Sequence, residues 1–374
     1  MLDAFVPQPP EWCLDWDGID AWFEEVRALK GCPQDPVHHG EGDVWVHTRM
    51  VVEALVADES WRGLDAQARR IVFWAAVLHD IGKPATTREE DGRITSRGHS
   101  RRGELMARSL LWRLGADMRE REHIAALIGH HLVPFFLLER DDPLKLAARI
   151  SLRTRCDWLA LLARADATGR ISPDQQRILD AVALFEEFAR DASCLDAPFA
   201  FASDHSRFQY FLKDGRDPAY EAYDDTRLTA ILMSGLPAAG KDTWIAQHLA
   251  GVPVVSLDRL RSELGIAHGK PQGQVVQLAR ERAREHLREA RDFVWNATNL
   301  TRQTRGSLIQ LFADYGARVR IVHLEAPADH LSTRNRARDD VVPQAVIENM
   351  LERWEMPDLT ECHELQLVSS DMSG

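Results

Sequence analysis

The stretch GLPAAGKDTW, residues 235–244, constrains the fold of this 374-residue chain more than any other. It follows the apolar run AILMS, which predicts a buried strand, and it leads into a predicted helix that begins near Asp242. A glycine-rich turn between a strand and a helix presents backbone amides that cradle phosphate groups. The loop residues predicted to bind phosphate are Gly235, Ala238, Ala239 and Gly240. Lys241 is expected to reach the β- and γ-phosphates of a nucleotide.

One position of this loop departs from the usual pattern, in which a serine or threonine follows the lysine and contacts magnesium. Asp242 occupies that position, and the hydroxyl of Thr243 comes one residue later. Because a carboxylate can hold a hydrated magnesium ion, we expect both residues to belong to a site for ATP, or another NTP, with Mg²⁺.

The spacing of apolar residues differs between the sequence before residues 194–225 and the sequence after them. Before this segment, stretches such as VHTRMVVEALV and ARRIVFWAAVLHD carry apolar residues at three- and four-residue spacing, which predicts helices. After it, short apolar runs such as VPVVSL and ARVRIVHLEAP alternate with helical segments, as in a parallel βαβ sheet. We therefore predict a multidomain chain, with an all-α domain at 1–193, a connecting segment at 194–225 and an α/β domain at 226–374.

Composition excludes several classes of protein. Hydrophobic residues at 45% and charged residues at 28% are typical of a soluble globular protein. The net charge of −12 argues against a general coat for nucleic acid, although it allows a local basic groove. The five cysteines are scattered and form no C-x-x-C pair, so we expect neither a disulfide framework nor a thiolate zinc site. No signal peptide or membrane span is indicated, and we expect a cytoplasmic protein without a membrane partner.

The helical half contains an ordered set of histidines and aspartates. Its members are His47, His79, Asp80, His99, His130 or His131, and Asp166. Imidazole and carboxylate groups without thiolates suit one or two divalent ions such as Mn, Fe, Co, Ni or Zn, and six such groups suffice for two ions that share a carboxylate. The adjacent His79 and Asp80 can both bind only where a helix ends, which the following Ile81-Gly82 provides.

This order, H…HD…H…H…D, resembles the HD phosphohydrolase superfamily over roughly residues 35–190. The resemblance implies that a metal is bound by His47, His79, Asp80 and Asp166, and that His99 with one of His130 and His131 completes a two-metal site. Of the last two, His131 is slightly favoured, and the sequence leaves the choice open. A metal-bound water has its pKa lowered from about 15.7 toward 7 and can attack phosphorus, so the implied activity is that of a phosphomonoesterase or phosphodiesterase.

Three further residues of this half are candidates for contact with a substrate. Lys83 and Arg170 stand four residues beyond His79 and Asp166, where they are placed to reach a phosphate near the metals. His39, in the stretch HHGEGDVWVHT, is predicted near the entrance of the site, and an exposed loop histidine is an equal alternative.

Two polar motifs of the second half follow the phosphate loop. Asp258 and Arg261, in SLDRLRSELG, lie one helical turn apart just past a predicted strand, where a carboxylate can accept a proton and an arginine can hold a phosphate. The arginines of STRNRARDD suit a lid over the γ-phosphate, because they would stabilise charge that develops during phosphoryl transfer. These lid arginines are Arg334, Arg336 and Arg338.

The motifs GLPAAGKDT, DRLR, NATN and RNRAR…VVP resemble those of the 5′-hydroxyl polynucleotide kinases, over about residues 226–357. The resemblance implies that Lys241 and Arg338 hold the ATP phosphates and that Asp258 is the general base. It also implies that Arg261 holds the 3′-phosphate of the acceptor and that Arg334 supports the lid. Asn296 departs from the acidic residue of the family pattern, as Asp242 departs from the hydroxyl residue.

The order of the two halves resembles the bacterial HD-Pnk end-healing enzymes. The resemblance implies removal of 2′,3′-cyclic phosphate or 2′-phosphate ends and ATP-dependent phosphorylation of 5′-OH ends, on RNA or DNA, which prepares the ends for ligation. The sequence leaves open whether a separate ligase is a partner. Two alternatives stay open. One is an HD hydrolase of a free nucleotide fused to a small-molecule kinase, and the other is a nucleic-acid sensor that uses both sites only for binding.

Overall fold

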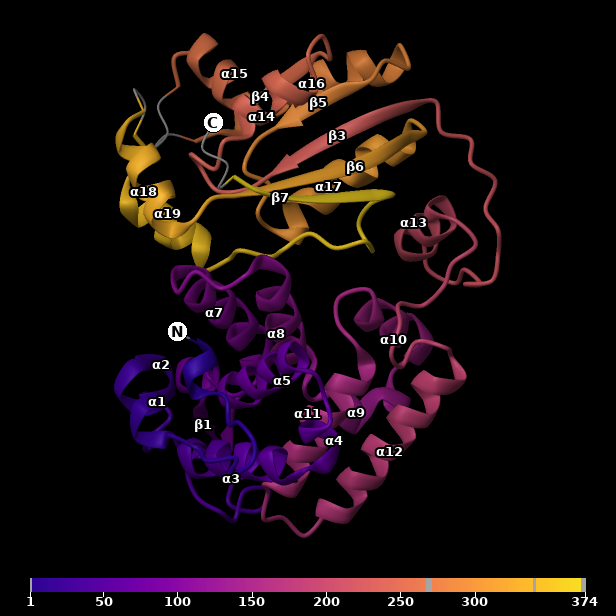
Figure 1. Ribbon diagram of the computed structural model, residues 1–374. Helices are drawn as coiled ribbons and strands as arrows, with labels where there is room; N and C mark the ends of the chain where they lie inside the picture. The colour runs from indigo at the N-terminus through magenta and orange to yellow at the C-terminus, as the bar shows by residue number, and fades with distance from the viewer. Residues whose placement is uncertain (1, 267–270, 339–340, 371–374) are drawn as a thin grey trace. The chain divides into compact units, whose positions relative to one another are not determined.

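The computed structural model describes residues 2–266, 271–338 and 341–370 (Figure 1). The chain forms two compact units, Met1–Ala200 and Phe201–Gly374. The division falls inside the predicted connecting segment 194–225, so the end of that segment belongs to the second unit. In the described ranges, no helix is long and apolar enough to cross a membrane.

The first unit is a bundle of helices, as the spacing of its apolar residues predicts. Its helices are α1 (Trp16–Trp22), α2 (Glu24–Arg27), α3 (Val44–Ala57), α4 (Glu59–Arg62), α5 (Ala66–Leu78), α6 (Lys83–Thr86), α7 (His99–Arg113), α8 (Met118–His130), α9 (Val133–Phe136), α10 (Pro143–Ser151), α11 (Cys156–Thr168) and α12 (Gln175–Asp191), with 3₁₀ turns at Leu2–Phe5 and Leu137–Glu139. An exposed hairpin of β1 (Arg88–Glu90) and β2 (Arg93–Thr95) interrupts them. It turns at Asp91-Gly92, where both residues have positive φ.

Helix α5 lies at the centre of this bundle. It packs against α3, α8 and α11, and every residue from Ile71 to Leu78 is buried. A helix that is apolar on all sides is surrounded by others, so the residues that follow it emerge inside the protein. Helices α3 and α5 each begin at an aspartate, Asp43 and Asp65, whose side chain accepts a hydrogen bond from a first-turn amide. These caps fix where the helices that carry the candidate ligands start.

The second unit is a parallel α/β domain. Its five-stranded sheet has the order β4-β5-β3-β6-β7, and every pairing is parallel. The strands are β3 (Leu228–Ser234), β4 (Val254–Ser256), β5 (Phe293–Asn296), β6 (Ala317–Glu325) and β7 (Glu364–Ser369). The helices are α13 (Asp204–Leu212), α14 (Lys241–His248), α15 (Leu257–Glu263), α16 (Gly273–Arg288), α17 (Arg302–Asp314), α18 (Ala328–Arg336) and α19 (Gln344–Leu351). The predicted fold class is confirmed for both halves.

Helices cover both faces of this sheet, because successive residues of a buried parallel strand point to opposite sides. Ala230 and Leu232 of β3 share one core with α16 and α17. Ile231 and Met233 face the other way, onto α14. The chain leaves β3 toward β4 and β5 on one side and later crosses to β6 on the other. The carboxyl end of β3 is therefore the switch point of the sheet, where ligands bind in this class of fold.

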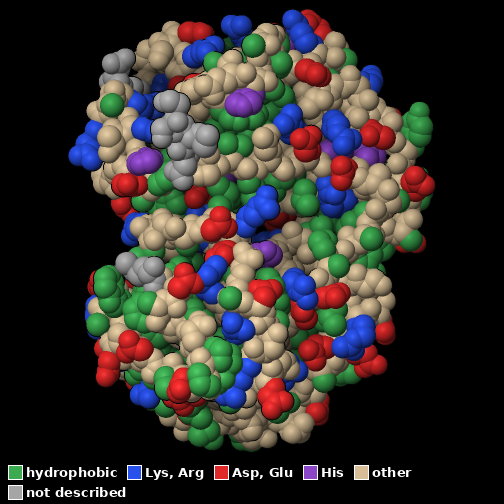
Figure 2. Space-filling model, in the orientation of Figure 1, with side chains coloured by type: hydrophobic (Ala, Val, Ile, Leu, Met, Phe, Trp, Pro, Cys, Tyr) green, Lys and Arg blue, Asp and Glu red, His purple; other side chains and the backbone are tan. Residues whose placement is uncertain are grey.

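Helix α13 belongs to the second unit, although the periodicity of its sequence is weak. The guanidinium of Arg207 donates hydrogen bonds to the carbonyl oxygens of Leu359 and His363, at 3.0 and 2.6 Å. Phe208 packs in the core beside the sheet, stacked on the ring of His363. The aromatic residues of this segment thus stabilise the α/β unit. On the face drawn in Figure 2, acidic and basic side chains are interspersed over each unit.

Candidate functional site

The histidines and aspartates of the first unit converge from five helices and their ends. His47 lies in the first turn of α3, whereas His79 and Asp80 follow the last turn of α5. His131 follows α8, and Asp166 lies in the last turn of α11. His99 begins α7. The side chains of His47, His79, Asp80, His131 and Asp166 are at most 1% exposed, so the protein has already removed them from water.

Two groups of three potential metal ligands share the carboxylate of Asp80. One contains His47, His79 and Asp80, and the other contains Asp80, His99 and His131, with the ligand atoms of each group within 4.8 Å of one another. Asp80 Oδ2 lies 3.2 Å from His79 Nε2, and Asp80 Oδ1 lies 3.4 Å from His99 Nε2. This is the arrangement expected for two divalent ions that share a carboxylate.

Buried polar atoms without hydrogen bonds support this assignment. Nε2 of His47 lies 3.1 Å from Asp166 Oδ1, and Nε2 of His79 lies 3.2 Å from Asp80 Oδ2, but neither nitrogen, nor the buried Oδ1 of Asp80, makes a hydrogen bond of good geometry among the described residues. An atom of this kind costs free energy unless a ligand satisfies it. The other ring nitrogens are held, since His79 Nδ1 donates to the Ala76 carbonyl at 2.8 Å and His131 Nδ1 to the Ile128 carbonyl at 2.7 Å. Such contacts orient Nε2 toward a metal.

The protonation states of Asp80, Asp166 and His131 suit metal binding, whereas the carboxylate of Asp80, against the effect of burial, raises the pKa of His79. Burial opposes ionisation, but the positive charges of His79 and Lys83 hold the pKa of Asp80 well below its usual range. Arg170 does the same for the pKa of Asp166, again against the effect of burial. Burial, with His99 and His79 nearby, lowers the pKa of His131 to about 3. Ionised carboxylates and neutral imidazoles are the forms in which these side chains bind metals.

The structure distinguishes between His130 and His131, the two adjacent histidines of which either could be the metal ligand by sequence. His131 Nε2 lies 3.3 Å from His99 Nε2 and 3.9 Å from Asp80 Oδ1. His130 instead contacts Arg153, with 3.0 Å between Nε2 and the guanidinium. It is His131 that lies in the ligand group with Asp80.

Lys83 and Arg170, the predicted phosphate contacts, lie at the edge of the same cluster. Lys83 Nζ is 2.7 Å from Asp80 Oδ2 and donates a hydrogen bond of 2.6 Å to Gln34 Oε1. Arg170 donates to Asp166 Oδ1 at 2.9 Å, even though α11 ends at Thr168 and Gly169 separates the two. Each cation is therefore oriented by a candidate metal ligand.

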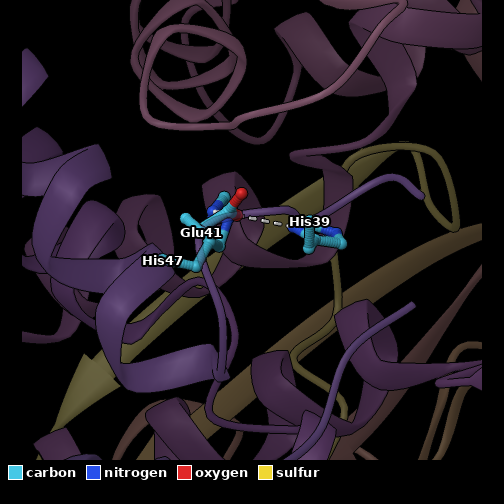
Figure 3. Close-up of side chains that lie close together, drawn as sticks. All are labelled: His39, Glu41 and His47. Atoms are coloured by element: carbon cyan, nitrogen blue, oxygen red, sulfur yellow. Dashed lines mark hydrogen bonds and ion pairs between the residues drawn. The ribbon is translucent and has the colours of Figure 1, made fainter. Parts of the chain in front are cut away.

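Glu41 is a member of this site that the sequence analysis missed. It lies between His39 and His47 (Figure 3), with Oε1 2.9 Å from His39 Nδ1 and 2.8 Å from His47 Nδ1. Its Oε2 accepts a hydrogen bond from the Ile171 amide at 2.8 Å. A carboxylate this close to His47 Nδ1 favours the proton on that nitrogen and leaves Nε2 to face the cluster. The signal available in the sequence is its place in HHGEGD, between two histidines.

His39 is not an exposed loop histidine. Its side chain is 11% exposed and hydrogen-bonds to Glu41 through Nδ1. Burial lowers the pKa of His39 to about 4, so the ring is neutral at pH 7. Together with Glu41 and His47 it forms a third group of potential ligands beside the other two.

In the second unit, the phosphate loop lies between β3 and α14 as predicted. Gly235 and Gly240 have φ values of +140° and +96°, which favour glycine, and Ala238 adopts φ +64°. A Cβ at Gly235 would collide with the carbonyl oxygen of Leu324 on β6. Lys241 Nζ donates to the carbonyl oxygens of Gly235 and Leu236 at 2.9 and 2.8 Å. These two carbonyls hold the ammonium group within its own loop.

A cavity of about 1060 Å³ opens over this loop. The predicted site residues that line it are Ala238, Gly240, Lys241, Asp242, Thr243, Asp258, Arg261, Arg334 and Arg338. Arg261 forms an ion pair with Asp258 and donates to Gln272 Oε1 at 2.9 Å. The guanidinium of Arg338 lies 3.9 Å from Asp258 Oδ2. Burial lowers the pKa of Lys241 to about 8, which leaves it protonated at pH 7.

The predicted lid segment contains one arginine that does not line this cavity and one anchored beside it. Arg336 is exposed and donates to the Ser332 carbonyl of its own helix. Arg334 donates to Ser370 Oγ and to the Ser370 carbonyl, at 2.8 and 2.9 Å. Between them, the buried Asn335 exchanges two hydrogen bonds with the backbone of Val342 and so ties the end of α18 to the residue that precedes Pro343. Its role depends on a contact seven residues away, which the motif does not reveal.

Comparison with family models identifies one domain in each unit. Residues 44–164 match the HD domain, and residues 231–357 match an AAA domain. The chain carries an HD domain followed by a P-loop, kinase-like domain. The first match begins with α3 and ends within α11, the helices that bring His47 and Asp166 together. The second contains the phosphate loop and the predicted lid arginines.

Curated relatives match only part of their own length. A bifunctional uridylyltransferase/uridylyl-removing enzyme of Gluconobacter oxydans is 30% identical over 225 residues, covering 57% of this chain and 22% of the relative. A multifunctional CCA protein of Alkalilimnicola ehrlichii is 30% identical over 183 residues, covering 48% of this chain and 42% of the relative. Among solved structures, a putative kinase from Chloroflexus aurantiacus aligns with a TM-score of 0.34 and 18% identity, over 39% of this chain and 87% of that one.

Proposed function

We propose that this protein heals broken nucleic-acid ends with two activities. The HD domain removes a 2′,3′-cyclic phosphate or a 2′-phosphate, and the P-loop domain transfers the γ-phosphate of ATP to a 5′-hydroxyl. The observation that carries the proposal is the grouping of Asp258, Arg261 and Arg338 around the cavity of Lys241. It supplies a proton acceptor, a cation for a further phosphate and a cation for the transferred phosphate on one wall.

In the kinase reaction, Asp258 is the proton acceptor. Its side chain is 60% exposed, so a hydroxyl at the end of a polymer can reach it. The ion pair with Arg261 orients the carboxylate, and the same guanidinium is in place for a phosphate of the acceptor chain. Lys241 and Arg338 stabilise the charge that develops as the γ-phosphate is transferred. A magnesium ion, when bound, neutralises charge on the nucleotide phosphates.

In the phosphoesterase reaction, the residues of the HD domain bind and orient the phosphate. A divalent metal, when bound, supplies a water of lowered pKa as the attacking group. Lys83 and Arg170 extend from the two carboxylate ligands and contact the phosphate oxygens. His39, neutral and hydrogen-bonded through Nδ1, presents its Nε2 as an acceptor near the entrance. The low exposure of the cluster keeps bulk water from the reacting phosphate.

The two products together are a 3′-hydroxyl and a 5′-phosphate, the pair of ends that a ligase joins. We therefore propose RNA or DNA ends as substrates and a separate ligase as the partner. The test is a nicked oligonucleotide with a 2′,3′-cyclic phosphate and a 5′-hydroxyl, incubated with ATP, Mg²⁺ and Mn²⁺. Conversion of both ends supports the proposal. Faster phosphorylation of free nucleosides or sugars than of the 5′-hydroxyl oligonucleotide would favour a small-molecule kinase instead.

A further inference from the structure

Asp242 and Asn296 stand where P-loop kinases carry two magnesium ligands. Those enzymes use the serine or threonine after the loop lysine and an aspartate of a second motif. In this chain the first position is a carboxylate, and the second, in NATN, is an amide. The two departures therefore amount to one exchange. In this chain the carboxylate, Asp242, is on the helix, and the neutral oxygen ligand, Asn296, is at the strand end. The summed charge of the two side chains is −1 in either arrangement.

The structure brings the exchanged residues into contact. Asp242 is the second residue of α14, and Asn296 is the last residue of β5, which pairs with β3. Asn296 Nδ2 donates a hydrogen bond of 2.8 Å to Asp242 Oδ1. Two carboxylates at this distance would repel each other, and a threonine with an asparagine would carry no charge. The exchange keeps one carboxylate in the pair.

Asn296 also presents an oxygen that no other described group satisfies. The residue is 6% exposed, and its Oδ1 is buried without a hydrogen-bond partner among the described residues. Both Asn296 and Asp242 line the cavity of Lys241. An amide oxygen and a carboxylate at one wall of a phosphate site are the hard ligands that magnesium prefers, with water completing its shell.

The place of the carboxylate has a further effect on nucleotide binding. The N-terminus of α14 attracts anions, and both Asp242 and the nucleotide phosphates are directed to it. Two anions at one helix end repel each other unless a cation lies between them. A nucleotide without a metal is therefore disfavoured here more than at a loop with threonine.

We propose that Asp242 and Asn296 together hold the magnesium ion of the bound nucleotide, with the carboxylate supplied by α14 and the amide oxygen by β5. This inference rests on the ATP-binding part of the proposed function and is independent of the acceptor. It makes magnesium a condition for nucleotide binding as well as for phosphoryl transfer.

The test compares four full-length proteins: the wild type, Asp242→Thr, Asn296→Asp and the double exchange. Binding of a non-hydrolysable ATP analogue is measured by calorimetry with Mg²⁺ and with EDTA, and melting temperature is measured with and without Mg²⁺ alone. Asp314→Thr, which removes an exposed carboxylate outside the cavity, is the matched control for net charge. No nucleic acid is present in any of these measurements.

In the wild type, Mg²⁺ should tighten analogue binding strongly. Asp242→Thr should reduce that enhancement by at least the ~10-fold that loss of a supporting group costs a metal site. It should also improve binding of the metal-free analogue. Asn296→Asp should lower the melting temperature in EDTA and recover with Mg²⁺, because it places two carboxylates in contact. The double exchange should restore the enhancement, and Asp314→Thr should leave it unchanged.

Three results would overturn the inference. An unchanged enhancement in Asp242→Thr would show that its carboxylate holds no metal. A double exchange no better than Asp242→Thr would show that the two residues do not act as a pair. A wild type that binds no analogue even with Mg²⁺ would refute the kinase half of the proposed function as well. If the wild type binds the analogue but Asp242→Thr shows the same Mg²⁺ enhancement, only the proposed magnesium pair is refuted, and the kinase proposal stands.

Discussion

The two candidate sites differ in how far folding has prepared them. The ligands of the HD domain are almost fully buried, and their ring nitrogens are already oriented by backbone carbonyls or by Glu41. In the P-loop domain, the side chains of Asp258 and Arg338 are 60% and 32% exposed, and Lys241 is hydrogen-bonded to its own loop. In the first site, the side chains lose their conformational entropy when the protein folds. In the second site, we expect them to lose it when a nucleotide binds. Loss of a group should therefore act through metal affinity in one and through the rate of transfer in the other.

Separating the two activities is the strongest test of this comparison. Asp80→Ala removes the carboxylate shared by both ligand groups, so phosphoesterase activity should be lost while 5′ phosphorylation is retained. Lys241→Ala should do the reverse, because it removes the cation that holds the β- and γ-phosphates. End-labelled assays on both variants measure the two activities. Circular dichroism tests whether each variant is folded, and loss of both activities in folded Asp80→Ala would contradict two independent sites.

Asp258 tests the rate side of the comparison. Asp258→Ala should slow phosphorylation of a 5′-hydroxyl oligonucleotide by about 10²- to 10⁴-fold, the usual contribution of a positioned base. Because its side chain is exposed, melting temperature and binding of the ATP analogue should stay close to the wild type. Single-turnover kinetics with ATP in excess separate the transfer step from binding. A near-normal transfer rate would remove Asp258 from the role of base, and Asp217→Ala, outside the cavity, is the control.

Glu41 tests the affinity side. Glu41→Gln keeps the shape of the side chain but weakens its hold on His47, so metal affinity should fall by about 10- to 100-fold. The phosphoesterase should recover at saturating metal, which distinguishes a positioning residue from a catalytic one. Mn²⁺ titration into the chelated protein gives the affinity. Glu53→Gln, on the exposed side of α3, should leave it unchanged, and equal affinities in the two variants would contradict the role of Glu41.

The smallest expected effect sharpens the boundary of the HD site. His130→Ala should leave Mn²⁺ affinity within about twofold of the wild type, as for substitutions away from a site, because His130 faces Arg153. His131→Ala should weaken it far more, since His131 lies in the ligand group of Asp80. Comparable losses in both variants would show that the pair of histidines acts together.

Local patterns in the sequence predict the fold better than they predict contacts between distant segments. The phosphate loop is recognisable because a strand, a glycine-rich turn and a helix follow one another within about twenty residues. The choice between His130 and His131 depends on where α8 ends and which ring faces α7, and the spacing of the motif fits either. Glu41 contacts His47 only because the loop before α3 folds back. The residues of α13 carry a weak helical period, and their aromatic side chains are explained by packing on the α/β unit.

The close approach of Gly82 to α7 has a consequence for how this protein can change over time. A Cβ at Gly82 would collide with the carbonyl oxygen of His99 and crowd the amide of Gly103. The separation between the His79-Asp80 corner and His99 is thus set by main chain resting on main chain, without intervening side chains. Substitutions in the surrounding hydrophobic core can therefore leave the separation between the His79-Asp80 corner and His99 unchanged. We expect descendants of this sequence to exchange the apolar residues of α5 and α7 freely before they accept any side chain at position 82.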